Sequence, residues 1–132
     1  MNPVVHFEMP YKKAGRVVSF YSKAFGWEMQ NTGEKMGNYV LAGTTNIDEH
    51  NMVKTPGNIN GGFFPQSPEY PAVTTVVISV DDLEESMKKV TGAGGKLAGK
   101  PMDIPGIGKY VAILDTEGNR VGMLQPEGHE GR

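Results

Sequence analysis

The start of the chain shows two patterns of apolar residues in succession, first with a repeat of two residues and then with the repeat of a helix. In the segment VVHFEM every second residue is apolar. In an extended strand Val5, Phe7 and Met9 therefore lie on one face, and His6 and Glu8 lie on the other. The pattern predicts a strand with one apolar face and one polar face.

After Pro10, which we expect to end this strand, the apolar period becomes helical. Apolar residues recur at i, i+3, i+4 and i+7 over residues 14–25, and Gly26 is a typical C-terminal cap. Further strands are predicted at 27–31, 38–44 and 61–65. Residues 1–65 thus form a β-α-β-β-β unit, in which the long polar segment 45–60 is expected to be a mobile surface loop.

The same order of elements returns later in the chain. Residues 66–71 predict a linker, and residues 73–80 predict a strand. A helix follows with Asp82 as its N-cap. The remaining strands are predicted at 96–102, 109–115 and 120–125. The second unit therefore covers residues 72–126, and residues 127–132 are expected to be a frayed tail.

Short sequence matches indicate that the two units are copies of each other. MGNYVLAGTT, from Met36, aligns without a gap with IGKYVAILDT, from Ile107, so that Tyr39 coincides with Tyr110. Flanking matches place Val4 and Val5 on Val76 and Val77, and Gly61 on Gly122; by the same spacing His6 pairs with Ile78. A chain built from two copies of one unit is expected to bind a ligand where the copies meet.

Composition excludes several classes of function. The chain has 132 residues, 38% hydrophobic and 21% charged, with a net charge of −2. It has no basic stripe for nucleic acid, no apolar run that could span a membrane and no signal peptide, so we expect a single cytoplasmic domain. Because it has no cysteine, a metal could be held only by His, Asp and Glu side chains.

His6 is the strongest candidate for chemistry. A neutral imidazole beside Glu8 could bind a divalent metal or act as a general base. The other interpretation is a half-buried histidine that is hydrogen-bonded to a neighbour, since one His and one Glu do not define a metal site. The run Asp48, Glu49 and His50 is interpreted as a solvated loop, because consecutive side chains seldom converge on one ion.

Aromatic residues in or beside the predicted strands could line a pocket. Packing in the core is the alternative for each of them. These residues are Trp27, Tyr39, Phe63 and Tyr110.

The tandem units, the histidine on the first strand, AFGW ending at Trp27 and LDTEGN ending at Asn119 resemble the glyoxalase/bleomycin resistance protein/dioxygenase group, the vicinal oxygen chelate superfamily. The resemblance spans about residues 3–126. It implies a single domain of the α+β class, in which tandem β-α-β-β-β units form a curved mixed sheet half-barrel with a central cleft. It also implies a homodimer.

The same resemblance implies metal ligands on the first and last strands of each unit, and most are missing here. His6 matches the first-strand histidine, but its expected mate is Ile78. The last-strand positions fall on Gly61 and Gly122. Glu8 could add a ligand but lies outside the family's pattern. Metal-dependent glyoxalase I and extradiol dioxygenase activities are therefore disfavoured.

The leading hypothesis is a protein that binds a hydrophobic or aromatic small molecule without a tightly bound metal. The alternative is a lyase, isomerase or dioxygenase with a divalent metal held by His6 and Glu8, and a third is a dimerisation module. Loop 45–60 is expected to cover part of the cleft. The predicted lining consists of His6, Glu8, Trp27, Tyr39, Phe63, Ile78, Tyr110 and Met123.

Overall fold

The computed structural model of the chain describes residues 1–69 and 72–127. It divides into a first unit, His6–Thr74, and a second unit, Met1–Val5 with Thr75–Arg132. This division differs from the predicted one at two places: the first five residues belong to the second unit, and the first unit runs to Thr74 instead of ending at residue 65. In the second unit the Pro3 carbonyl accepts a hydrogen bond from the Ser79 amide at 2.9 Å. Parts of the predicted linker and nearly all of the predicted tail lie outside the described residues.

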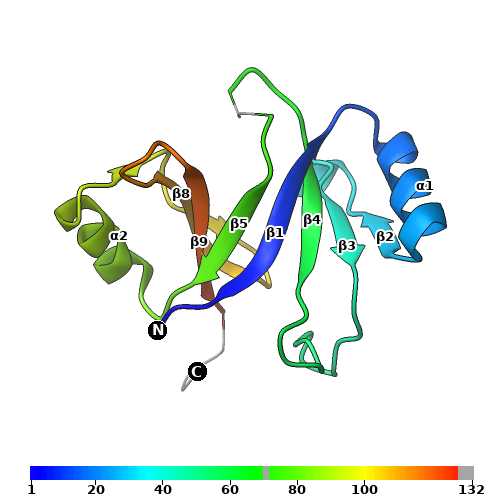
Figure 1. Cartoon of the computed structure of the whole chain (residues 1–132), viewed down its shortest axis with the longest axis horizontal. Coiled ribbons are helices and arrows are strands. Elements are labelled where there is room, and N and C mark those ends of the chain that lie inside the picture. The colour runs from blue at the N-terminus through cyan, green and yellow to red at the C-terminus, as the bar shows by residue number, and fades with distance from the viewer. Residues whose placement is uncertain (70–71, 128–132) are drawn as a thin grey trace. The chain divides into compact units, whose positions relative to one another are not determined.

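The first unit follows the predicted β-α-β-β-β order. Its elements are β1 (Val4–Tyr11), α1 (Ala14–Phe25), β2 (Glu28–Asn31), the short 3-10 helix η1 (Glu34–Met36), β3 (Val40–Gly43) and β4 (Asn60–Pro65). The strand order is β2-β3-β4-β1, with β1 parallel to β4 and the other pairs antiparallel. Figure 1 shows α1 beside β2, and the loop between β3 and β4 at one end of these strands.

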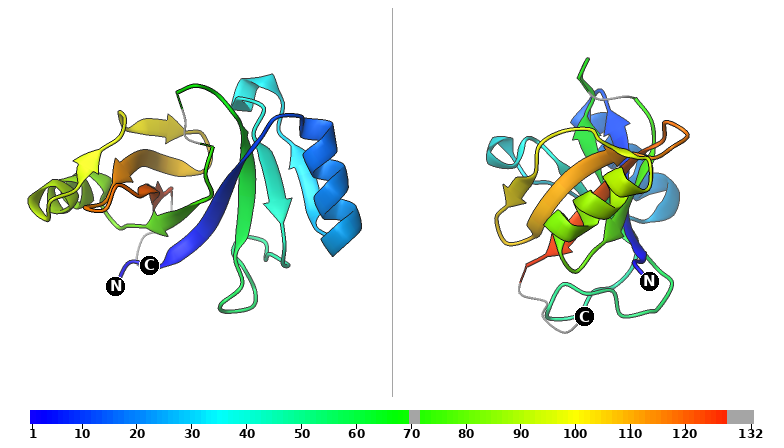
Figure 2. Two further views of the ribbon diagram at one scale, coloured as in Figure 1. Left: turned by 45° about the horizontal axis from the view of Figure 1, so that its top comes forward. Right: turned by 90° about the vertical axis from the view of Figure 1, so that its left-hand side faces the viewer.

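One face of this strand set is buried under α1. Val40, Ala42 and Phe63 have at most 1% of their surface exposed. Side chains from α1 and β1 pack against them, among them Val17 and Phe7. The other views also place α1 along one side of these strands (Figure 2). This face is the apolar face predicted from the two-residue period of β1.

The second unit repeats the arrangement with one difference. Its elements are β5 (Thr75–Ser79), α2 (Leu83–Gly92), β6 (Lys96–Leu97), β7 (Met102–Ile104), β8 (Gly108–Leu114) and β9 (Arg120–Pro126). The strand order is β5-β9-β8, with β6 and β7 both paired to β8. Residues 96–102 are thus not one strand as predicted, because Gly99 and Pro101 lie in the stretch that separates β6 from β7.

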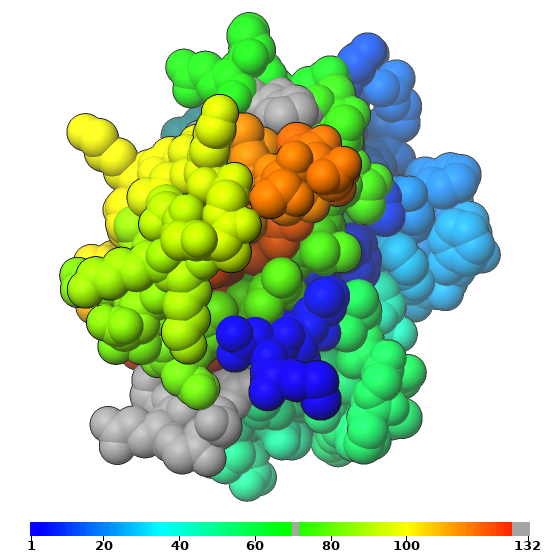
Figure 3. Space-filling model, turned by 60° about the vertical axis from the view of Figure 1, so that its left-hand side comes forward, coloured from blue at the N-terminus to red at the C-terminus, as the bar shows by residue number. Residues whose placement is uncertain are grey.

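Helix α2 begins and packs as its sequence predicts. The Asp82 side chain accepts a hydrogen bond from the Glu85 amide at 3.1 Å, which caps the helix. Leu83 is 2% exposed and packs in a core cluster with Val111 and Met123. In the space-filling view the yellow-green α2 lies at the surface of this unit (Figure 3). Each unit therefore has its own helix-covered core.

Strand β1 extends past Pro10, contrary to the prediction that this proline ends it. Pro10 lies opposite Phe64 in the parallel pair, and Tyr11 lies opposite Pro65. A proline lacks one donor but fits extended backbone. The Tyr11 carbonyl then accepts a hydrogen bond from the Gln66 amide at 2.8 Å, so pairing continues beyond the proline.

The strand registers correct the predicted matches between the two units. Leu41 pairs with Gly62, and Ala112, its repeat mate, pairs with Gly122. The mate of Gly122 is therefore Gly62 and not Gly61.

The predicted match between the first strands of the two units is corrected in the same way. Glu8 pairs with Gly62 and Val77 pairs with Gly122, so Val77 is the mate of Glu8. Two residues earlier, Thr75 is the mate of His6, and the predicted match of His6 with Ile78 is wrong. The error arose from aligning valine pairs, which are common in any strand.

Among residues 1–69 and 72–127, neither helix has the length and apolar character needed to cross a membrane.

The core of the first unit can be tested with two phenylalanines of unequal exposure. Replacing Phe63, which is 1% exposed, with alanine leaves a cavity and should lower the free energy of unfolding by about 3–5 kcal/mol. Phe20→Ala is the matched control, because Phe20 is 57% exposed and the loss should stay below about 1 kcal/mol. Urea denaturation measures both. Equal losses of unfolding free energy in the two variants would contradict the burial of Phe63 in this core.

Candidate functional site

Three polar side chains of the first unit form a hydrogen-bonded group on the strand face that α1 does not cover. The Tyr39 hydroxyl donates to Glu8 Oε2 at 2.9 Å, and it lies 3.0 Å from His6 Nε2. All three side chains are half-buried. We call these residues the His6–Tyr39–Glu8 group.

Strand geometry brings the three residues together. His6 and Glu8 are two apart on β1, so they share a face, and the two-residue period predicted this. Tyr39 directly precedes β3, which is separated from β1 by β4. Its ring reaches back across β4 at Gly62, where a Cβ atom would overlap the ring and hydroxyl of Tyr39. Gly62 therefore makes room for Tyr39.

The hydrogen bonds define the protonation of the group. The Tyr39 hydroxyl gives its proton to Glu8, so its oxygen accepts the Nε2 proton of His6. Burial lowers the pKa of His6 from 6.5 to about 4, because the charged imidazolium loses solvation. At neutral pH, His6 is an uncharged imidazole that donates through Nε2. This is the half-buried, hydrogen-bonded histidine that was one of the two predicted interpretations.

The donor set does not fit a tightly held divalent metal. His6 and Glu8 both use the Tyr39 hydroxyl as a partner. Within the described part of the chain, no three His, Cys, Asp or Glu residues lie together as a candidate metal site. Usual protein sites supply three or more ligands. The space next to Gly62, on the same face as Glu8, is filled by the ring of Tyr39.

The second unit keeps the aromatic part of this arrangement and lacks the ionisable part. The Tyr110 ring lies against Gly122, where an added Cβ atom would come within 2.7 Å of it. The mates of His6 and Glu8 are Thr75 and Val77, which are buried. The repeat thus conserves a tyrosine on a glycine in both units, and His6 and Glu8 are specific to the first.

The predicted lining residues fall on two different faces of their units. His6, Glu8 and Tyr39 form one group, and Tyr110 holds the position equivalent to Tyr39. Trp27 and Phe63 belong to the core under α1, where Trp27 stacks on Tyr21 with ring centroids 4.7 Å apart.

Two predicted lining residues of the second unit, Ile78 and Met123, also belong to its core. Met123 is 4% exposed, and Ile78 packs against the same cluster. The core packing that was the alternative for the aromatic residues therefore describes Trp27 and Phe63. Direct contact of Tyr39 and Tyr110 with a ligand stays a prediction.

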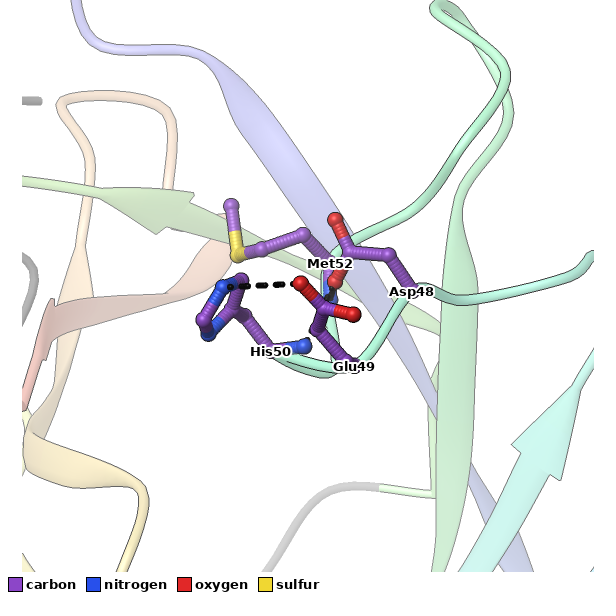
Figure 4. Close-up of polar contacts among 4 residues, drawn as sticks. All are labelled: Asp48, Glu49, His50 and Met52. Atoms are coloured by element: carbon purple, nitrogen blue, oxygen red, sulfur yellow. Dashed lines mark hydrogen bonds and ion pairs between the residues drawn. The ribbon is translucent and has the colours of Figure 1, made fainter.

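The run Asp48, Glu49 and His50 lies in a loop, as predicted. Asp48 Oδ1 accepts hydrogen bonds from the amides of His50 and Met52, which hold the pKa of this carboxyl below its usual value. His50 Nε2 lies 3.5 Å from Glu49 Oε1, and both side chains are exposed (Figure 4). Asp48 therefore stabilises the turn through these two hydrogen bonds. The loop also contains a bridge between Ile47 and Val53; whether it covers a ligand stays a prediction.

Gly62 is the residue that sequence reasoning missed. The prediction took Gly61 for the last-strand position, although Gly61 lies on the opposite face against the Phe7 ring. The two consecutive glycines, 61 and 62, were the available signal. Strand interiors seldom contain glycine unless another group approaches closely.

The buried histidine generates a pH prediction. Between pH 6.5 and 4 the unfolded chain binds a proton at His6 that the folded chain does not, so the free energy of unfolding should fall as the pH is lowered through this window. The share from His6 is up to about 3 kcal/mol. His6→Gln should flatten the slope measured by urea denaturation, whereas His50→Gln, at an exposed position, should leave it unchanged. A wild-type slope in His6→Gln would contradict the burial of His6.

The fit between Tyr39 and Gly62 can be tested with a double-mutant cycle. Gly62→Ala should destabilise the wild type by about 1–3 kcal/mol, because the added methyl group displaces the Tyr39 ring. The same change in a Tyr39→Ala background should cost less than about 0.5 kcal/mol. Gly99→Ala is the matched control, since a Cβ atom at Gly99 meets no atom within 4 Å. Equal costs in both backgrounds would contradict the contact.

Comparisons with known proteins agree with this architecture. A methylmalonyl-CoA epimerase variant from Streptomyces coelicolor, in complex with 2-nitronate-propionyl-CoA, superposes with a TM-score of 0.71 at 11% identity, covering 100% of this chain and 99% of that one. Another methylmalonyl-CoA epimerase, in complex with methylmalonyl-CoA, also gives 0.71, at 12% identity and with the same coverage. At these identities the likeness shows the fold, and it confirms the predicted α+β class.

Relatives in sequence carry related names. A glyoxylase-like domain-containing protein of Didymella fabae is 29% identical over 116 residues, which are 85% of this chain and 84% of that protein. CFP32 of Mycobacterium tuberculosis, named as a glyoxylase, is 31% identical over 68 residues, which are 52% of this chain and 26% of that protein. The match thus spans about a quarter of the length of CFP32. The profile of one family matches residues 4–123, and the chain belongs to this family, the glyoxalase/bleomycin resistance protein/dioxygenase superfamily.

Proposed function

We propose that the chain binds a small organic molecule at the His6–Tyr39–Glu8 group, without a tightly bound metal. One observation carries this proposal: the Tyr39 hydroxyl is held between a neutral imidazole and a carboxylate on the strand face that α1 leaves uncovered. A hydrogen-bonded polar group on a partly apolar surface is typical of ligand sites.

The chemistry of this face indicates what the ligand should offer. Glu8 and the Tyr39 oxygen can accept hydrogen bonds, so a hydroxyl, amide or amine of a ligand has partners here. Leu41 lies on the same face as Tyr39 and is 41% exposed, and it supplies apolar contact surface. A hydrophobic or aromatic molecule with one polar donor therefore suits the face.

A second candidate is proton transfer on a substrate, because a carboxylate that is hydrogen-bonded to a phenol is a plausible general base. Glu8 would take a proton from a carbon next to a carbonyl. The solved structures with this fold include a methylmalonyl-CoA epimerase in complex with methylmalonyl-CoA. In deuterated water, exchange of the C2 proton of methylmalonyl-CoA, lost in Glu8→Gln, would favour this candidate over simple binding.

Two further expectations stay proposals. Elemental analysis of protein purified without chelator should find substoichiometric Mn, Fe, Co, Ni and Zn, because the donor set offers one imidazole and one carboxylate. A homodimer is expected from the family resemblance, and light scattering measures its mass.

The binding proposal is tested with two substitutions that change the polar group and keep the shape of the side chain. A thermal-shift screen of hydrophobic metabolites and antibiotics first identifies a ligand of the wild type. Calorimetry should then show that this ligand binds at least about 10-fold more weakly to Tyr39→Phe and to Glu8→Gln. This is the loss of affinity expected for one good hydrogen bond. Tyr21→Phe removes a hydroxyl from the core side of the same unit and should bind like the wild type.

Two outcomes would count against the proposal. One is a screen in which no compound raises the melting temperature. The other is a ligand whose affinity is the same in the wild type, Tyr39→Phe and Glu8→Gln, because it would bind elsewhere.

A further inference from the structure

Asn60 is a further polar residue on the face that carries the His6–Tyr39–Glu8 group. It begins β4 and lies opposite His6 in the parallel pair of β1 and β4. Residues paired in this way project to the same side of a sheet, and neighbouring strands are about 4.8 Å apart. In Figure 1, β4 lies between β1 and β3. Asn60 is therefore the neighbour of His6 across the strands, on the side that α1 leaves uncovered.

The side-chain amide of Asn60 is held in one orientation. Its Oδ1 accepts hydrogen bonds from the backbone amides of Thr44 at 2.7 Å and Thr45 at 3.0 Å. Because both partners are N–H donors, the atom that they bind is the oxygen, and the other atom is the NH₂ group. Within residues 1–69 and 72–127, this Nδ2 has no hydrogen-bond partner. Asn60 thus keeps a fixed donor that the fold does not use.

His6 has the complementary group. Its Nε2 donates to the Tyr39 hydroxyl at 3.0 Å, since that hydroxyl gives its own proton to Glu8. The Nδ1 atom of this tautomer has no proton and carries a lone pair. No described residue donates a hydrogen bond to Nδ1. An acceptor on β1 therefore lies beside a donor on β4.

A structural role accounts for only half of the Asn60 amide. The loop between β3 and β4 starts at Thr44 and returns at Asn60, and the Oδ1 hydrogen bonds join its two ends. The Thr44 hydroxyl adds a further bond across the base of the loop, to the Ile59 carbonyl at 2.5 Å. These contacts need an oxygen at the end of the Asn60 side chain. They leave the NH₂ group of a half-buried residue for another partner.

A donor beside an acceptor selects the polar edge of the ligand. The N–H and C=O groups of a lactam or a carboxamide lie side by side, so they match an unprotonated imidazole nitrogen and an NH₂ group. A carboxylate cannot donate to His6, and its charge would be repelled by Glu8. Leu41, which is 41% exposed on this face, offers apolar surface for an attached ring. The ligand should thus be uncharged at this edge.

We propose that this face binds the amide edge of an aromatic lactam or carboxamide. The ligand N–H donates to His6 Nδ1, and Asn60 Nδ2 donates to the ligand carbonyl. Tyr39 and Glu8 are positioning residues in this arrangement, because they keep the proton of His6 on Nε2. The inference rests on the proposed function, since it names the class of ligand for the same face.

NMR spectroscopy of protein with ¹⁵N-labelled histidine tests the acceptor. In the free protein, His6 should be protonated at Nε2 and unprotonated at Nδ1. Adding 2-quinolinone, an aromatic lactam, should shift the Nδ1 resonance of His6, whereas the exposed His50 should give unchanged resonances. A proton on Nδ1 in the free protein would overturn the proposal. An unchanged Nδ1 resonance at about 2 mM 2-quinolinone would also overturn it.

An Asn60→Asp variant tests the donor. It keeps an oxygen for the two threonine amides and removes the NH₂ group, so it should bind 2-quinolinone at least about 10-fold more weakly in calorimetry. Asn31→Asp is the matched control. Asn31 Oδ1 also accepts from a backbone amide, that of Gly33 at 2.9 Å, and Asn31 pairs with Val40, on the face under α1. Equal affinities of the two variants would overturn the proposal.

A modified ligand and a stability measurement complete the test. N-methyl-2-quinolinone lacks the N–H, so the wild type should bind it at least about 10-fold more weakly than 2-quinolinone. Equal binding would overturn the assignment of His6. Asn60→Asp should lower the melting temperature less than Asn60→Ala, because only aspartate keeps the oxygen at the base of the loop. The reverse order would contradict the orientation of the amide.

The outcomes also separate this inference from the proposed function. A ligand that is weakened by Tyr39→Phe and Glu8→Gln but unaffected by Asn60→Asp would overturn the inference and leave the proposed function standing. A screen in which no compound binds, 2-quinolinone included, would overturn both.

Discussion

Burial of one strand face under one helix is the constraint on which each unit depends. In the first unit α1 covers the side of the strands that carries Phe7 and Phe63, and in the second unit α2 covers the side that carries Val111 and Met123. Because side chains alternate along a strand, this burial also decides which residues remain for contacts with other molecules. In the first unit His6, Glu8 and Tyr39 lie on the face that α1 leaves uncovered, opposite to the side that carries Phe7 and Phe63.

Most of the fold followed from local patterns. The helix at 14–25, its αL glycine cap and the Asp82 N-cap of α2 were predicted from residue spacing and capping chemistry, which act within a few residues. The extension of β1 through Pro10 was missed, because it depends on pairing with β4, more than fifty residues later in the chain. Likewise, the split of 96–102 into β6 and β7 depends on their common partner β8.

The candidate site was predictable in part. The shared face of His6 and Glu8 follows from the period of one strand, whereas the place of Tyr39 depends on a ring crossing a neighbouring strand. Trp27 and Phe63 were grouped with these residues because aromatic side chains suit pockets and cores equally well in a sequence. The two-residue period already separated Phe7 from His6, and extending it through the pairing of β1 with β4 would have separated Phe63 from Glu8 as well.

The contact of Tyr39 with Gly62 has a consequence for how this chain can evolve. A larger side chain at position 62 has no room while Tyr39 is present, because the ring of Tyr39 already fills that space. One substitution at position 62 would meet a steric clash, and one at position 39 would leave His6 and Glu8 without the hydroxyl between them. A change at either position alone is therefore unfavourable, so we expect the tyrosine and the glycine to change together or not at all.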